Sequence, residues 1–265
     1  MKKKKQTFLW KISHENKKDS YLFGTMHVRD KRAFGALPIL EEKINKCEVF
    51  AAEFNLDDAN QGQINFHTLL PENQLLENLF KPKRYHALST LFYKQTGMNI
   101  GLLNNQKPFF VYQLLTETLF KEDMPFALDH YLYEYAKEQS KTLAGVETFA
   151  EQIAILNNIS IKEQATILNQ TVKNFKKYRR QLKKLTDLYQ SGNLSQLNKS
   201  ARKSMGKLRK MMIDDRNFIM ADRIAEMTNQ QTTFAAVGAG HLGGKNGILR
   251  LLKLKGIKIK AISTN

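Results

Sequence analysis

YLFGTMH at residues 21–27 is a short apolar run that breaks at a glycine and is followed by a histidine. A near copy, TFAAVGAGH, occupies residues 233–241 close to the other end of the chain. Each copy predicts a buried strand followed by a Gly-x-x-His turn. The two copies together indicate a site that is assembled from both ends of the chain and contains His27 and His241.

The chain has 265 residues, enough to bury the core of one large domain or of two smaller ones. It contains no apolar run of the roughly 18 residues that a membrane span needs, so no transmembrane segment is expected. The basic start at residues 1–5 is similar to that of a signal peptide, but Lys11 follows too soon for an apolar core. We therefore expect a cytoplasmic protein as the sequence stands, or a secreted or periplasmic one if an upstream signal has been removed.

Cys47 is the single cysteine of the chain. An internal disulfide and a cysteine-rich zinc site are therefore excluded. The residue stands among helix-forming residues just before an apolar run, which favours a buried structural thiol over a catalytic one.

The net charge of +17 is concentrated in two runs that contain no acidic residue. Residues 173–184 carry seven basic side chains and residues 199–210 carry six. A solvated helical face explains such runs. An anionic substrate, a membrane surface or a nucleic acid are the alternatives, although no recognisable nucleic-acid module accompanies the runs and no specific nucleic acid is expected.

The order strand, helix, strand is expected between residues 20 and 52. A strand at 20–23 leads to His27, a helix begins near Pro38, and a strand at 49–52 ends on Glu53. A right-handed parallel crossover places His27 and Glu53 at the same edge of a sheet, where open α/β sheets bind ligands. Taken alone, Glu53 could also be a carboxylate that caps a loop amide.

The middle of the chain is predicted to be largely helical. A short strand at 141–146 interrupts it and ends on Glu147, and a last strand is expected at 257–262. The predicted fold class is therefore α/β, with a mostly parallel central sheet built from the N- and C-terminal segments. We expect one domain over residues 1–265 with a helical insert at about 60–230.

The glycine-rich turn GAGHLG at residues 238–243 also fits the dinucleotide-binding fingerprint. That fingerprint requires an acidic residue about 20 positions later, and no Asp or Glu follows Glu226. We therefore interpret Gly238 and Gly240, like Gly24 in the first copy, as residues that open space around a histidine.

Histidines and carboxylates at separate strand ends are the ingredients of a hydrolytic metal site, with Mn, Co or Zn as the expected divalent metal. The helix-borne H-E-x-x-H zinc motif is absent from the sequence. A Ser–His triad has no G-x-S-x-G turn to support it. Acid–base catalysis by His and Glu without a metal remains an alternative.

The chain resembles the TraB/GumN family, which includes the animal Tiki proteins. Matching segments run in order along nearly the whole chain: LWK at 9–11, YLFGTMHV at 21–28, the strand that ends on Glu53, KP at 107–108, LD at 128–129, AGVET at 144–148, EQ at 151–152, RN at 216–217 and VGAGHLG at 237–243. Val146 departs from the leucine usual in the family, a change expected to be neutral. The resemblance implies a fold similar to the erythromycin-esterase and ChaN-like group, and metal-dependent peptidase chemistry.

The resemblance also implies roles for individual residues. His27 and His241 would be metal ligands, Glu53 a ligand or general base, and Glu147 a second carboxylate. Asp129, Arg216 and Asn217 match family positions whose roles it leaves open. In the hydrolysis we expect, Arg216 would help the metal to polarise the substrate carbonyl. The substrate would be a peptide or another small molecule. One alternative is a non-catalytic protein that binds haem or another anion in the same cleft, and another is a nucleic-acid or membrane-surface binder that uses residues 173–210.

Overall fold

The structure is a computed structural model that describes residues 7–58, 67–119 and 123–264. The chain divides into two compact units. The sheet unit consists of Met1–Asp58, Glu122–Gln152 and Lys184–Asn265, and the helical unit of Ala59–Lys121 and Ile153–Lys183. The helical segment expected at about 60–230 therefore contributes to both units.

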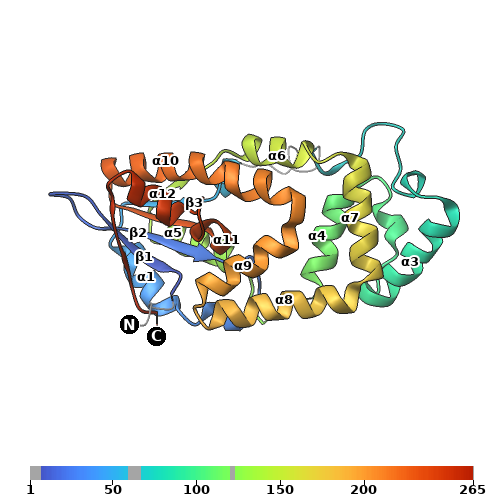
Figure 1. Cartoon of the computed structure of the whole chain (residues 1–265), viewed down its shortest axis with the longest axis horizontal. Coiled ribbons are helices and arrows are strands. Elements are labelled where there is room, and N and C mark those ends of the chain that lie inside the picture. Colours follow the sequence, from blue (N-terminus) through green and yellow to red (C-terminus); the bar gives the residue numbers. More distant parts are fainter. Residues whose placement is uncertain (1–6, 59–66, 120–122, 265) are drawn as a thin grey trace. The chain divides into compact units, whose positions relative to one another are not determined.

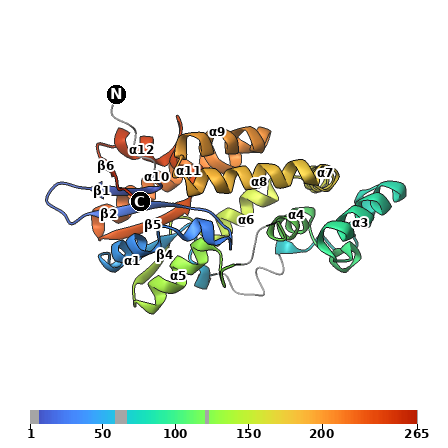
Figure 2. The ribbon, with the colours of Figure 1, turned by 90° about the horizontal axis from the view of Figure 1, so that it is seen from below.

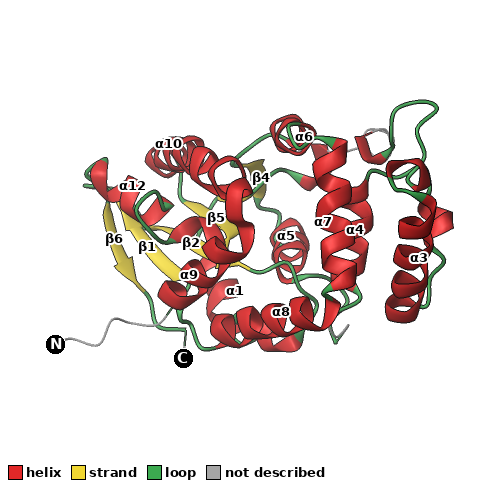
Figure 3. Cartoon of the chain, turned by 45° about the vertical axis from the view of Figure 1, so that its right-hand side comes forward, coloured by secondary structure: helices red, strands yellow, loops and turns green. Residues whose placement is uncertain are grey.

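The sheet unit is built on six strands in the order β4-β3-β5-β2-β1-β6 (Figure 3). Neighbouring strands from β4 to β2 are parallel, whereas β1 is antiparallel to both β2 and β6. The expected α/β class with a mostly parallel sheet is confirmed. The strands are β1 Leu9–Ser13, β2 Ser20–Thr25, β3 Val49–Ala52, β4 Thr142–Gly145, β5 Thr233–Gly238 and β6 Lys258–Ala261.

The two similar stretches at the ends of the chain lie side by side in this sheet. Strands β2 and β5 pair in parallel, with Tyr21 opposite Phe234 and Thr25 opposite Gly238. Both strands are buried along almost their whole length, as expected for central strands covered on both faces. The two predicted Gly-x-x-His turns therefore leave the sheet from adjacent strands at the same edge.

Helices cover both faces of the sheet (Figure 2). Helices α1 (Leu37–Asn45) and α5 (Leu128–Glu138) pack on one face. Helices α10 (Asp215–Gln230), α11 (Ala239–Leu242) and α12 (Ile248–Leu254) pack on the other. Helix α9 (Leu194–Met205) contacts α11.

The core of the sheet unit is dominated by aromatic side chains. Phe50 of β3 stacks on Phe234 of β5 with 5.9 Å between ring centroids, and Tyr133 of α5 meets Phe50 edge-on. All three side chains are fully buried. Cys47 is buried as well, which confirms the expected buried thiol, and burial raises its pKa to about 12.

The helical unit contains α3 (Pro82–Thr96), α4 (Pro108–Glu117) and α7 (Ile161–Lys173), and α7 packs against both of the others (Figure 1). Prolines near the first positions of α3 and α4 fit the unpaired amides of a helix start. The core of this unit includes Leu88, Phe92, Val111, Leu115, Leu168 and Val172.

Helices α6 (Phe149–Asn157) and α8 (Phe175–Gln190) contain residues of both units. The shorter elements are the 3₁₀ turns Lys31–Phe34, Leu56–Asp58, Glu77–Leu79, Ile100–Leu103 and Gly206–Leu208, and a π-helical turn, Lys210–Asp214. Among the described residues, no helix is both long and apolar enough to cross a membrane. The basic start at residues 1–5 lies outside the described residues.

Candidate active site

Four neighbouring parallel strands end at one edge of the sheet, and a polar side chain follows each of them or lies close by. Glu147 follows β4, Glu53 follows β3, His241 follows β5 in α11, and His27 follows β2. The backbone amide of Glu147 also donates to the carbonyl oxygen of Glu53 at 2.7 Å, which holds the two strand ends together. The strand-end residues singled out in the sequence therefore lie at the edge where parallel sheets place their ligands.

Arg216 joins the two glutamates. Its Nε lies 3.0 and 3.1 Å from the carboxylate oxygens of Glu147, and its Nη2 donates to Glu147 at 2.6 Å and to Glu53 at 2.9 Å. Nη1 donates to the carbonyl oxygen of Met212, 3.2 Å away in the π-helical turn. A guanidinium group suits this position because its planar fork of donors can serve two carboxylates together.

The electrostatics of this cluster follow from burial and from the charge of Arg216. The side chain of Glu147 is 2% exposed and that of Arg216 is 10% exposed. Burial alone would lower the pKa of Arg216, but hydrogen bonds and charge from Glu147 and Glu53 raise it. Burial likewise would raise the pKa of Glu53, but its interactions with His241, with the charge of Arg216 and with the amide of Gly238 outweigh burial and lower it. Arg216 and Glu53 are therefore both charged at neutral pH.

His241 is held in one orientation by Asn217. The side-chain Nδ2 of Asn217 donates to the carbonyl oxygen of Asn246 at 2.7 Å, so its Oδ1 must be the atom that accepts from His241 Nδ1, 2.6 Å away. Burial lowers the pKa of His241 to about 4, so the ring is neutral at pH 7. The proton then lies on Nδ1, and Nε2 presents its lone pair 3.9 Å from Glu53 Oε1.

Two glycines allow the backbone to approach closely at this edge. A Cβ on Gly238 would lie 2.9 Å from Glu53 Oε1, the atom that accepts from the Gly238 amide at 2.6 Å. A Cβ on Gly24 would lie 2.5 Å from Leu242 Cδ1 in α11. Neither glycine has a positive φ, so close packing rather than an unusual turn requires them. Gly240 has more room and contributes its carbonyl oxygen, which accepts from Asn198 Nδ2 at 3.1 Å.

His27 lies in a separate pair. Its Nδ1 is 2.8 Å from Asp129 Oδ2, at the first turn of α5, and its side chain is 69% exposed. The structure thus brings together Glu53, Glu147, Arg216, Asn217 and His241, and pairs His27 with Asp129. Across residues 7–58, 67–119 and 123–264, no group of three or more His, Cys, Asp or Glu side chains is placed to hold a metal ion.

Three supporting residues were not predicted from the sequence. Gln152 donates to Glu53 at 3.3 Å and to Glu147 at 3.4 Å, Asn198 braces the glycine-rich turn, and Tyr189 donates to the carbonyl oxygen of Gly24 at 2.7 Å. Gln152 belongs to the EQ pair that carries part of the family resemblance, and this was a usable signal. Asn198 and Tyr189 stand in helices without any local pattern that marks them.

Comparison with known proteins places the chain among its relatives. The profile of the TraB/PrgY/gumN family matches residues 8–261, nearly the whole chain. The chain belongs to this family. Its relatives include the Metalloprotease TIKI1 proteins of Danio rerio and Xenopus tropicalis, each 25% identical over 96% of this chain. The Metalloprotease TIKI homolog of Nematostella vectensis is 24% identical over 97%.

The chain spans 63% of the length of the Danio rerio relative and 61% of the Xenopus tropicalis one. No solved structure matches the chain significantly. The family membership and the relatives' names support a family of metal-dependent hydrolases, whereas the roles of individual residues rest on the geometry above.

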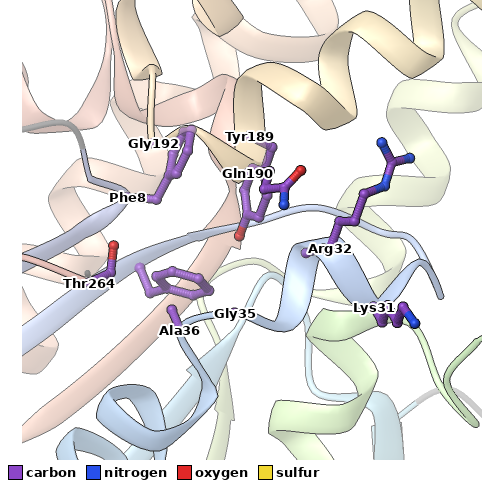
Figure 4. A pocket seen from close by; sticks show the side chains of 11 residues that line it. Phe8, Lys31, Arg32, Gly35, Ala36, Tyr189, Gln190, Gly192 and Thr264 are labelled. Carbon is purple, nitrogen blue, oxygen red and sulfur yellow. The ribbon is translucent and has the colours of Figure 1, made fainter.

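A cavity of about 450 Å³ lies elsewhere in the sheet unit (Figure 4). Phe8, Phe23 and Tyr189 form its aromatic wall, and the rings of Phe8 and Tyr189 stack at 4.5 Å. Arg32 also lines it, but ion pairs with Asp30 and Asp187 neutralise its charge. This cavity is not lined by any of the residues brought together at the strand ends, which are Glu53, Glu147, Arg216, Asn217 and His241.

Proposed function

We propose that this chain is a divalent-metal-dependent hydrolase and that its substrates are peptides. The observation that carries the proposal is the pair formed by His241 and Glu53. A neutral imidazole presents the lone pair of Nε2 toward an ionised carboxylate at 3.9 Å, at the ligand-binding edge of a parallel sheet. Membership of a family with relatives named metalloproteases supports the same chemistry.

The donor atoms at this site are of the types that bind a divalent metal. His241 Nε2 and Glu53 Oε1 would supply two donors, and His27 is the third that the family resemblance implies. Asn217 on His241 and Asp129 on His27 each bind Nδ1, which is how outer-shell groups orient metal-ligating imidazoles. Neutral imidazole and carboxylate together suit Mn, Co or Zn. Such a cation supplies Lewis acidity and lowers the pKa of a bound water.

The remaining residues have roles that follow from their contacts. Glu53 is ionised and 29% exposed, so it is the carboxylate that can take a proton from water or return one to a leaving group. Glu147 is almost fully buried, and both of its oxygens accept from Arg216. We therefore assign Glu147 and Arg216 to positioning Glu53, in place of the carbonyl-polarising role expected for Arg216.

Elemental analysis of protein purified without a metal-affinity tag is the first test. About one equivalent of Mn, Co or Zn is expected. Treatment with a chelator should abolish hydrolysis of a mixed peptide library, read by mass spectrometry, and one of the three metals should restore it. His241→Ala should lose both the metal and the activity, because it removes a metal–nitrogen bond.

His86→Ala is the matched control, since it removes an exposed histidine from α3 in the helical unit. It should retain the metal content and activity of the wild type. Turnover that persists undiminished in the chelated protein would favour metal-free acid–base catalysis by His241 and Glu53. Equal metal content in His241→Ala and the wild type would contradict the proposal.

A further inference from the structure

The helical unit contains a groove of about 560 Å³, within the size range of ligand sites. One wall is a stripe on α7 in which Lys162, Thr166, Asn169, Gln170 and Lys173 follow one another at helical spacing. Lys81 and Arg84 at the start of α3 line it as well. No Asp or Glu lines the groove in the described part of the chain.

The described residues do not neutralise the charge of this groove. None of Lys81, Arg84, Lys162 and Lys173 forms an ion pair with a described residue. The basic run at residues 199–210, in the sheet unit, is partly neutralised, because its Arg209 and Lys210 form ion pairs with Asp214 and Asp215. The helical unit as a whole carries thirteen Lys and Arg against four Asp and Glu. Four like charges around one concavity repel one another, and an anionic ligand would relieve that repulsion.

The spacing of the cations points to an extended ligand. Lys162 and Lys173 are eleven residues apart on α7, which at 1.5 Å per residue separates them by about 16 Å along the helix. A single phosphate group is too small to reach both. Single-stranded nucleic acid is bound through successive stacked bases, and Phe80 is the one aromatic side chain among the described residues that line the groove.

The groups between the cations suit a polypeptide. The side-chain amides of Asn169 and Gln170 each offer donors and an acceptor, the combination that matches the N–H and C=O groups of an extended peptide backbone. The half-buried Leu79 and Phe80 and the buried Ala165 supply apolar contact surface. We infer that this groove binds an extended acidic segment of a polypeptide. The choice of a peptide rests in part on the proposed function, since a peptidase must capture polypeptide chains.

The test measures binding and not turnover, so the inference and the proposed hydrolase can fail separately. Full-length protein treated with a chelator is titrated into a fluorescein-labelled peptide of alternating glutamate and glycine, and the anisotropy is recorded at several salt concentrations. The acidic peptide should bind with an affinity that falls with salt, and the glutamine counterpart should bind at least about tenfold more weakly.

Lys162→Glu/Lys173→Glu should weaken binding at least about tenfold. The control Lys199→Glu/Lys203→Glu makes the same change in net charge on exposed positions of α9 and should change the affinity by less than about threefold. Asn169→Ala/Gln170→Ala should weaken binding at every salt concentration without changing the salt slope, because it removes no charge. Circular dichroism checks that each variant is folded.

Three results would overturn the inference. Equal losses in the two charge-reversal variants would mean that net charge alone attracts the peptide. Equal affinities for the glutamate and glutamine peptides would mean that the groove does not select acidic residues. Tighter binding of labelled oligothymidylate than of the acidic peptide, lost in Lys162→Glu/Lys173→Glu, would make the groove a nucleic-acid site.

Discussion

The side-chain oxygen of Asn217 accepts from Nδ1 of His241 at 2.6 Å, while its amide nitrogen is held by the carbonyl oxygen of Asn246. The side-chain amide of Asn217 cannot rotate by 180° without losing both hydrogen bonds, so it determines which nitrogen of His241 carries the proton. A side chain that is almost fully buried therefore decides what the histidine offers to the site.

Asn217→Ala should free His241 from this constraint. We expect the ¹⁵N shifts of the ring to change from those of a single Nδ1–H tautomer to those of a mixture, and metal affinity to fall by about 10–100-fold. Asn217→Asp keeps an acceptor for Nδ1 and should retain the tautomer. An unchanged ring spectrum in Asn217→Ala would show that another contact orients His241.

Arg216→Met should be strongly destabilising because it leaves the buried carboxylate of Glu147 without its partner. A loss of about 3–5 kcal/mol in the free energy of unfolding is expected from urea denaturation. The double variant Glu147→Met/Arg216→Met removes both charges and should recover much of that loss. The prediction fails if the double variant loses as much stability as Arg216→Met and Glu147→Met added together, because the Glu147–Arg216 ion pair would then not be the source of the loss.

The stability of the metal-free protein should depend on pH through His241. The folded-state pKa is about 4 and the ordinary value is 6.5, so between these values the unfolded chain binds a proton that the folded chain does not. Stability is therefore lost as the pH falls from about 6.5 to about 4, by about 3 kcal/mol in total. His241→Gln should show a shallower decline over this window in parallel urea titrations. Identical pH profiles would mean that His241 is protonated as readily in the folded state as in the unfolded chain.

Gly24→Ala should destabilise the sheet unit, because the new Cβ would lie 2.5 Å from Leu242 Cδ1 and 3.0 Å from Ala239 Cα. A cost of about 1–3 kcal/mol is expected, measured as a fall in Tm and in urea midpoint. Gly35→Ala is the control, since no heavy atom lies within 4 Å of its Cβ position and its φ is −59°. It should be neutral or slightly stabilising.

Much of the sheet could be predicted because its central strands are short apolar runs bounded by polar residues. Glu53 and Glu147 could be predicted to lie at one edge of the sheet, because the carboxyl ends of parallel strands lie at the same edge. The position of β5 between β2 and β3 could not be predicted, because strand order depends on contacts between segments about 200 residues apart. The family resemblance marked Gln152, but its contacts with Glu53 and Glu147 could not be predicted, because they form only when α6 is placed against the strand ends.

The central place of β5 also bears on how the protein is made. Strands β2, β3 and β4 emerge from the ribosome long before residues 233–238. Until β5 has emerged, β2 and β3 lack the strand that lies between them in the sheet. The nascent chain can form the β1–β2 hairpin and the β3–β4 pair only as separate halves. Residues 233–241 then supply both the strand that joins the two halves and His241. Synthesis itself thus delays assembly of this edge of the sheet until β5 has been made.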